Sequence, residues 1–134
     1  MVSCVGPQLS GEGRVLGANR YLRIRNLTRD TELANGCEVA DTSAKRRRGL
    51  LEHTGLGPGQ GLWIVPCEGV HTFGMKFAID VIFVNKKRVV VKVRPNMVAR
   101  RISFCLRARS VVELPVGVIV ASGTQPGDQL EMIR

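Results

Sequence analysis

Residues 71–85 form a largely apolar run that contains side chains capable of catalysis or binding. His71, Met75 and Asp80 interrupt this run. An imidazole and a carboxylate are groups that transfer protons in catalysis, and both can also bind metals. The run therefore raises three kinds of chemistry: acid–base catalysis, metal binding and ligand recognition.

A metal site is disfavoured by the geometry of a strand. His71 and Met75 share one face of an extended strand but lie about 13 Å apart at 3.3 Å per residue. Zinc ligands lie within about 2.3 Å of the ion. A mixture of His, Met and the Asp80 carboxylate also suits no common structural metal. The sequence predicts neither a metal nor a cofactor.

Covalent catalysis is disfavoured for a related reason. Thr72 and His71 are adjacent, so on a strand their side chains point to opposite faces. Cys67 lies four residues before His71 in a different turn, and no nucleophile elbow is present. Asp80 and Glu113 could form the carboxylate pair of a hydrolase only if their strands are neighbours, which the sequence leaves open.

The elements that must position these side chains are mostly short strands. Apolar and β-branched runs predict strands at residues 21–25, 37–41, 62–65, 71–75, 80–84, 88–93, 110–114 and 128–133. Thr42 or Ser43 is expected to cap a helix that runs through Glu52, and residues 115–122 predict a single helical turn. Eight short strands with close turns predict a mainly β sandwich or barrel with one or two short helices, rather than βαβ units.

Length and composition predict one domain. The 134 residues are 44% hydrophobic and 23% charged, which disfavours disordered and membrane classes. Scattered Gly and Pro predict a flexible leader over residues 1–19 and a single β-rich domain over residues 20–134. The sequence shows no secretory signal and no apolar run of about eighteen residues. Four cysteines about thirty residues apart predict isolated buried thiols in a reducing cytoplasm.

The net charge of +9 raises nucleic acid as a partner. The basic groups fall in different predicted elements: residues 45–48, 86–88, 92 and 94, 100–101, and 107 and 109. Pro95 and Asn96 are expected to open a basic loop. Nucleic-acid binders usually cluster their charge and add stacking aromatic side chains, so solvation of the surface explains most of these residues.

Eight short motifs occur in the order typical of one family. They are Ala40-Asp-Thr42, Arg46-x-Arg48-Gly-Leu-Leu51, Gly61-Leu-Trp63, Pro66-Cys67, His71-Thr-Phe-Gly-Met75, Ile79-Asp-Val-Ile-Phe83, Val112-Glu-Leu-Pro-x-Gly117 and Gly127-Asp128. The chain thus resembles the family named domain of unknown function 192 over about residues 22–132. The resemblance implies a compact β sandwich or barrel with a small helix and no agreed activity. Leu51 stands where the family often has Met, Ala78 where it often has Pro, and Asn96 where an aromatic is common.

The predicted helix adds Arg48 to the candidate site. Ala44, Arg48 and Leu51 stand at i, i+4 and i+7, so Arg48 is expected to share a face with apolar neighbours and point inward. A carboxylate is costly to bury without a partner. A structural salt bridge from Arg48 to Asp80 or Glu113 is therefore an alternative to a functional site.

The same residues describe a ligand pocket, and a binding module rather than an enzyme is the function we expect. The candidate ligand-binding residues are Arg48, Trp63, His71, Phe73, Met75, Asp80 and Glu113. The aromatic and thioether groups would form an apolar wall, and the polar groups would orient a small molecule, an anion or a peptide. Two alternatives stay open: an acid–base enzyme that uses His71 with Asp80 or Glu113, and a nucleic-acid-binding protein. No membrane partner is predicted.

Overall fold

Strands dominate the part of the chain that the computed structural model describes, residues 3–4 and 21–134. The elements are β1 (Ser3–Cys4), β2 (Leu22–Asn26), β3 (Thr31–Ala40), α1 (Ser43–Arg48), β4 (Gln60–Ile64), β5 (Gly69–His71), β6 (Ile79–Val84), β7 (Val90–Met97), β8 (Ile102–Phe104), β9 (Ser110–Leu114), α2 (Val118–Ser122) and β10 (Leu130–Ile133). The mainly β prediction is confirmed. Apart from β1, the predicted leader lies outside the described residues.

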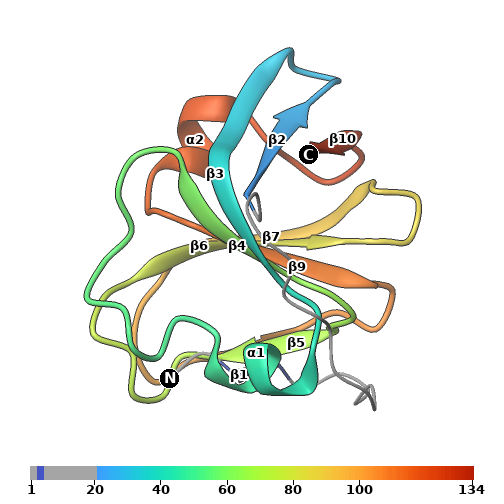
Figure 1. The fold of residues 1–134 in the computed structure, drawn as a ribbon. Helices are drawn as coiled ribbons and strands as arrows, with labels where there is room; N and C mark the ends of the chain where they lie inside the picture. Colours follow the sequence, from blue (N-terminus) through green and yellow to red (C-terminus); the bar gives the residue numbers. More distant parts are fainter. Residues whose placement is uncertain (1–2, 5–20) are drawn as a thin grey trace.

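The strands form two sheets. A seven-stranded sheet has the order β10-β2-β3-β4-β9-β6-β7, and a three-stranded sheet has the order β1-β5-β8. Figure 1 shows the larger sheet curling so that β5 and α1 lie below its central strands and α2 lies above them. All neighbouring strands are antiparallel except β3 and β4, which are parallel and joined through α1. One βαβ-like connection is therefore present, although the sequence favoured a sandwich or barrel over βαβ units.

The central strands contribute to two cores because both of their faces are covered. Every residue of β6 is buried. Alternate side chains of a strand point to opposite faces. Val81 and Phe83 accordingly belong to a lower core, on the side of β5, whereas Ile82 and Val84 belong to an upper core on the side of β2, β10 and α2. A one-residue step along β6 thus moves a side chain from one core to the other.

Helix α1 begins as predicted but ends earlier. The Thr42 hydroxyl accepts a hydrogen bond from the Lys45 N–H at 3.2 Å, which caps the first turn. Gly49 leaves the helix with φ 48° and ψ −128°. The expectation that Arg48 points inward is wrong: Arg48 is exposed, and Arg46 is 2% exposed. The predicted apolar face relied on Leu51, which lies beyond the end of the helix and so does not define a helical face.

The segment around residue 95 is strand rather than a basic loop, which corrects a second expectation. Strand β7 continues through Pro95 and Asn96 to Met97. It lies at the edge of the larger sheet, where a proline removes no required ladder bond. Asn96 has φ 50°, and the pairing with β6 shifts register between Ile79 and Val81. The strand therefore absorbs Pro95 and Asn96 through a local irregularity.

The three-stranded sheet and the cysteines also depart from the predictions. The strand predicted at residues 71–75 ends at His71, and the missed strand β8 pairs with it.

The prediction of isolated thiols is wrong for Cys67, which is disulfide-bonded, while Cys37 and Cys105 are free. Burial, together with the charges of nearby carboxylates, raises the pKa of Cys37 to about 12.

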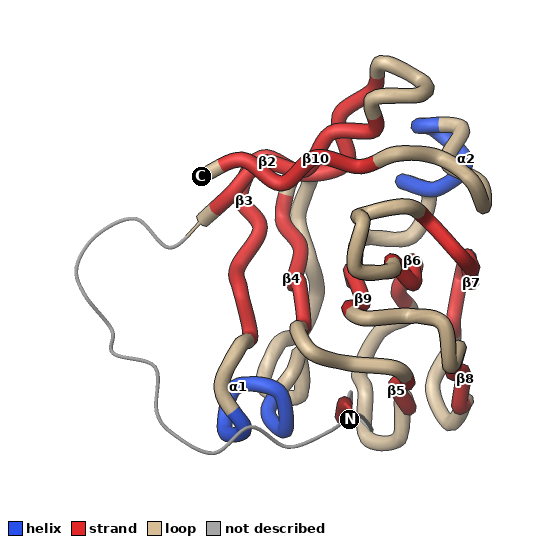
Figure 2. Tube along the Cα trace, turned by 90° about the vertical axis from the view of Figure 1, so that its right-hand side faces the viewer, coloured by secondary structure: helices blue, strands red, loops and turns tan. Residues whose placement is uncertain are grey.

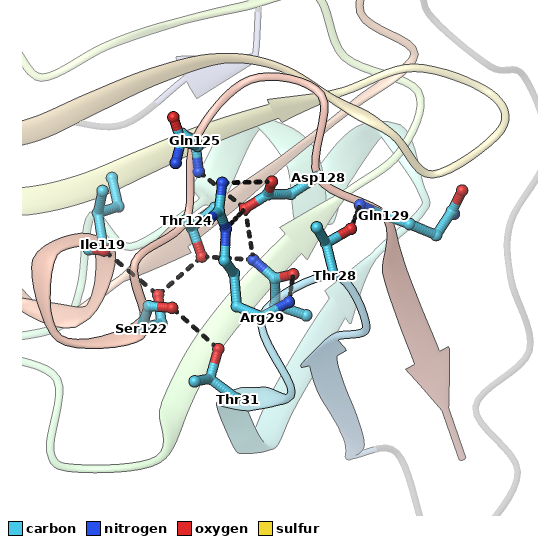
Figure 3. Close-up of polar contacts among 10 residues, drawn as sticks. Thr28, Arg29, Thr31, Ile119, Ser122, Thr124, Gln125, Asp128 and Gln129 are labelled. Atoms are coloured by element: carbon cyan, nitrogen blue, oxygen red, sulfur yellow. Dashed lines mark hydrogen bonds and ion pairs between the residues drawn. The ribbon is translucent and has the colours of Figure 1, made fainter.

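A polar network closes the upper core where the β2–β3 turn meets the turn before β10 (Figure 3). The Asp128 carboxylate accepts hydrogen bonds from Asn26 Nδ2, Arg29 Nε and the Gln125 N–H, each at 3.0 Å. Burial alone would raise the pKa of Asp128, but the hydrogen bonds from Arg29, Asn26 and Gln125 and the charge of Arg29 outweigh it and lower the pKa. The network stabilises the fold by tying turns about a hundred residues apart.

Candidate functional site

The seven predicted site residues do not converge. Trp63 and Asp80 lie on the upper side of the larger sheet, Met75 and Glu113 on its lower side, His71 and Phe73 at the three-stranded sheet, and Arg48 at the surface. The structure therefore replaces one predicted cluster with several separate environments.

Asp80 serves the fold. Its carboxylate is 1% exposed and accepts three backbone hydrogen bonds, from Asn96 N–H at 2.8 Å, Gly117 N–H at 3.1 Å and Ile119 N–H at 2.9 Å. The last two donors belong to the start of α2, whose first N–H groups have no partner inside the helix. With these bonds made, Asp80 fixes α2 and β7 to β6.

Glu113 has opposite surroundings. It is fully buried on β9, in register with Leu62 of β4 and Val81 of β6, so its side chain points into the lower core. Neither carboxyl oxygen has a hydrogen-bond partner among residues 3–4 and 21–134. Burial raises the pKa of Glu113 to about 8. The side chain is therefore mostly protonated at neutral pH.

The two carboxyl groups do not form a catalytic pair, although their strands are neighbours. Asp80 stands opposite Leu114, and Val81 stands opposite Glu113. Residues that pair directly share a face, so Asp80 and Glu113 point to opposite sides of the sheet. The arrangement required for a paired-carboxylate hydrolase is not formed.

His71 is likewise separated from both carboxyl groups. It stands opposite Ile102 of β8, and its ring centroid lies 5.6 Å from that of Phe73. The preceding residue, Val70, is fully buried in the lower core. Because neighbouring strand residues alternate, the His71 side chain lies on the outer side of the small sheet. The predicted acid–base combinations of His71 with Asp80 or Glu113 are therefore not assembled.

Trp63 and Met75 pack rather than form the wall of a shared pocket. Each is 7% exposed, and they belong to different cores. The guanidinium of Arg88 lies 4.7 Å from the Trp63 ring centroid, a cation–π contact. The Trp63 Nε1–H has no acceptor among the described residues. The indole is thus a covered side chain.

Arg48 lies at a cavity of about 290 Å³ between β3, α1, the turn after α1 and β4, here called the α1 pocket. The lining residues are Glu38, Val39, Ala40, Lys45, Arg48, Gly49, Glu52, His53 and Leu62. His53 Nε2 lies 3.9 Å from Glu38 Oε2. Two cations, two carboxylates and an imidazole therefore surround an apolar floor of Ala40 and Leu62.

Sequence reasoning found only Arg48 among the charged groups of this pocket. Lys45 was assigned to a solvated basic run, and Glu38 comes from a strand that pairs in parallel with β4. His53 carried a signal, because it is one of only two histidines and directly follows Glu52. The parallel β3–β4 pair, which places α1 over one end of both strands, is the feature that the sequence did not reveal.

A larger hollow of about 540 Å³ offers less chemistry. It lies between β3, α2 and the turn at Pro58 and Gly59. Glu32 is the one ionisable side chain among its described lining residues, and it already forms an ion pair with Arg23 at 2.9 Å. The volume alone does not supply the converging polar groups that orient a ligand.

The described part of the chain lacks two other features. No three side chains of His, Cys, Asp or Glu within residues 3–4 and 21–134 come together as a metal-binding group. Within the same residues, no helix has the length and apolar character needed to cross a membrane.

Known proteins match this chain over most of its length. A UPF0127 protein of Thermococcus sibiricus is 32% identical over 117 residues, which are 79% of this chain and 71% of that protein. A UPF0127 protein of Pyrococcus furiosus is 33% identical over 115 residues, which are 81% of this chain and 97% of that protein.

Two crystal structures share the fold. A protein of unknown function from Novosphingobium aromaticivorans has a TM-score of 0.71 and 24% identity, covering 82% of each chain. A protein described as a putative transcription regulator from Sinorhizobium meliloti has a TM-score of 0.73 and 22% identity, covering 87% of this chain and 98% of that one. At these identities the likeness shows the fold alone.

The family model described as Uncharacterized ACR matches residues 25–132. That range begins in β2 and ends in β10, so it spans the curled sheet, both helices and the α1 pocket. The names of the two relatives state no function, and the Novosphingobium aromaticivorans structure is described as a protein of unknown function. The chain belongs to the uncharacterised family named domain of unknown function 192.

Proposed function

We propose that this domain is a small-molecule-binding module whose α1 pocket takes a ligand bearing both a carboxylate and an amino group, such as an amino acid or a short peptide. The observation that carries the proposal is the meeting of both signs of charge around one apolar floor. A few placed polar groups over an apolar surface are typical of ligand sites.

The lining residues divide into three chemical parts. Lys45 and Arg48 are cations of α1, and a guanidinium suits the planar carboxylate of a ligand. Glu38 and Glu52 are carboxylates that favour an ammonium group and repel a second negative charge. The volume of about 290 Å³ lies at the small end of ligand sites, which favours an amino-acid-sized group over a nucleotide.

The test is a thermal-shift and calorimetry screen with free amino acids, dipeptides and their uncharged analogues. We expect one or more zwitterionic compounds to raise the melting temperature, because a ligand that binds only the folded state stabilises it. Amidation of the ligand carboxylate should weaken binding at least tenfold. Trp63 belongs to the other core, so calorimetry is a better reporter here than tryptophan fluorescence.

A matched pair of variants locates the site. Arg48→Ala should reduce the affinity at least tenfold without lowering the melting temperature of the free protein. Arg47→Ala removes an exposed cation from the same helix that does not line the pocket, so it should leave the affinity unchanged. Equal losses in both variants, or no binding by any zwitterion in the screen, would contradict the proposal.

The compartment is a separate proposal. We infer a cytoplasmic location from the free thiols of Cys37 and Cys105, and the disulfide at Cys67 provides the test. Disulfides persist in oxidising compartments and are rare in the cytosol. A cytoplasmic location requires that the Cys67 disulfide of the structure be reduced in the cell, so alkylation of the protein in intact cells, followed by mass spectrometry, should find Cys67 as a free thiol. An oxidised Cys67 in that experiment overturns the cytoplasmic assignment.

A further inference from the structure

The outer face of the three-stranded sheet exposes aromatic and apolar side chains. Ile102 and Phe104 of β8 are each 60% exposed, while Ser103 between them is buried. His71 stands opposite Ile102 on the same face, and its ring contacts Phe73, which is 46% exposed. These four residues, His71, Phe73, Ile102 and Phe104, are called the β8 platform.

The ring of Phe104 is the uncovered part of the platform. Phe104 stands opposite Gly69, which has no side chain to cover the ring. The Phe104 carbonyl accepts a hydrogen bond from Lys92 Nζ at 2.9 Å, so a cation lies beside the platform as well. Arg100 and Arg101, both exposed, precede β8 directly. An uncovered ring bordered by cations is suited to stacking a planar group that carries negative charge nearby.

A second feature follows β8 in the chain. The turn at residues 85–88 and the loop that follows β8 enclose a hollow of about 430 Å³, here called the basic cleft, lined by Asn85, Lys86, Lys87, Arg107, Ala108 and Arg109. Four cations and no carboxylate stand among these described lining residues. The sequence had assigned them to different elements, and the structure brings them together.

Both sides of the basic cleft are held by hydrogen bonds. The Asn85 side chain accepts from the N–H groups of Lys87 and Val89 at 2.9 and 3.0 Å, which fixes the hairpin turn. The Arg109 N–H donates to the Val84 carbonyl at 2.8 Å, which fixes the loop to the end of β6. The cations therefore project from a supported backbone.

The platform and the cleft are joined by one tight turn. The Ala108 N–H donates to the Cys105 carbonyl at 3.0 Å, and Cys105 directly follows Phe104. A turn of this kind holds its ends within about 7 Å. In Figure 2, β5, β7, β8 and β9 lie together on the same side of the molecule. One extended ligand can therefore reach the Phe104 ring and the cations at Arg107 and Arg109.

We propose that the β8 platform and the basic cleft form a binding surface for single-stranded nucleic acid. Exposed bases stack on Phe104 and Phe73, and phosphates run along the cations of the cleft. Stacking on aromatic side chains combined with a positively charged groove is how proteins bind single strands without sequence preference. The net charge of +9 supports association with a polyanion.

An anionic membrane is the competing partner, because Ile102 and Leu106 are exposed aliphatic groups beside the same cations. Two observations favour nucleic acid. The Phe104 ring lies on the face of the small sheet with Gly69 opposite it, and the Phe73 ring lies beside His71 from the turn that follows β5. The four cations gather around one open, shallow hollow, which concentrates positive charge for a phosphate backbone.

The test measures fluorescence anisotropy of a labelled twelve-nucleotide oligothymidylate with the full chain at 50 and 200 mM salt. We expect binding that weakens steeply with salt, since counterion release dominates it. A duplex of the same length should bind at least tenfold more weakly, because its bases are not free to stack. The double variant K87A/R107A should lower the affinity at least tenfold and reduce the salt slope by about 2.

Matched variants separate stacking from charge. Phe104→Leu should weaken binding fivefold or more with an unchanged salt slope, whereas Tyr21→Leu, an exposed aromatic of the other sheet region, should have no effect. Arg23→Ala, which removes an exposed cation of β2, is the control for charge. Circular dichroism establishes that each variant is folded.

Three outcomes overturn the proposal: no binding at 50 mM salt, equal binding of single strand and duplex, or equal losses in the control variants. Vesicles that contain phosphatidylserine form a second arm of the experiment. Sedimentation with these vesicles in the absence of oligonucleotide binding assigns the surface to a membrane instead. Binding to the oligonucleotide that Arg48→Ala leaves unchanged shows that the surface is distinct from the α1 pocket.

Discussion

Asp80 on β6 and Glu113 on β9 are buried carboxyl side chains on neighbouring strands, yet their surroundings are opposite. Asp80 accepts three backbone hydrogen bonds in the upper side of the sheet. Glu113 has none among the described residues and lies in the lower core. Asp80 pairs with Leu114, one position away from Glu113 in the β6–β9 register. Because a one-residue step moves a side chain to the other face of the sheet, the two carboxyl groups lie in different environments.

The contrast teaches what burial of a charged group does and does not indicate. A carboxyl group with several backbone donors holds elements together, as Asp80 does for α2 and β7. A carboxyl group in apolar surroundings without donors raises its pKa and becomes neutral instead. Asp80 therefore contributes directly to the stability of the fold, whereas Glu113 reduces that stability at alkaline pH.

The largest effect is expected from removing the Asp80 carboxylate. Asp80→Ala leaves three N–H groups without their acceptor, among them the buried Ile119 N–H, and removes the cap of α2. Each hydrogen bond contributes up to about 1.5 kcal/mol, so the loss of three should lower the unfolding free energy by about 4 kcal/mol. Urea denaturation followed by circular dichroism measures it. A loss below about 1 kcal/mol would show that α2 does not depend on Asp80.

The second effect is a pH dependence that Glu113 introduces. Its pKa is about 8 in the folded chain against an ordinary value of 4.5, so the folded state binds more protons between these two pH values. Stability from this group is therefore present below about pH 4.5 and is lost as the pH rises to about 8. The free energy of unfolding of the wild type, relative to Glu113→Gln, should fall by about 3 kcal/mol from pH 5 to pH 8. A flat difference between the two proteins would contradict the burial of an unpaired carboxyl group.

The mainly β fold could be predicted from the sequence because strand signals are local. Residues 110–114 have the predicted bounds as β9, and the Thr42 cap starts α1 as expected. Strand β8 was missed because its three residues lie among arginines that resembled a loop. The end of α1 was missed because the backbone of Gly49 stops the helix before Leu51. Tertiary packing overrides the local pattern at each of these places.

The sites depend on pairings that no local pattern contains. Asp80 and Glu113 were correctly predicted to lie in strands, but whether they meet depends on the β6–β9 register. The basic residues of the cleft lie about twenty positions apart in the sequence and come together through the β6–β9 pairing, which places Val84 opposite Ser110, and the hydrogen bond from Arg109 to Val84. The sequence thus indicates the chemical type of each residue but not which residues lie next to one another in space.

A third carboxylate, Asp128, sharpens the comparison by having the opposite pH behaviour to Glu113. Hydrogen bonds from Arg29 and Asn26 keep its pKa low despite burial. Stability from this group is present above the ordinary carboxyl pKa of 3.8 and is lost as the pH falls through the lower pKa of the folded state. Asp128→Ala should lower the free energy of unfolding by about 2 kcal/mol at pH 7 and by less near pH 3. Equal losses at both pH values would show that the charge of Asp128 is not what stabilises the turns.

The smallest effect on the free energy of unfolding is expected for Arg48→Ala, because Arg48 is an exposed charged residue, in contrast to the buried Asp80 and Glu113. Its side chain is exposed at the α1 pocket, and exposed positions without special contacts usually change stability by less than about 0.5 kcal/mol. Arg46 in the same helix is 2% exposed, so Arg46→Ala should lower the free energy of unfolding by at least 1 kcal/mol through lost packing. Urea denaturation of both variants measures the difference. A large loss in Arg48→Ala would identify a structural role, and this arginine would then no longer be available to recognise a ligand.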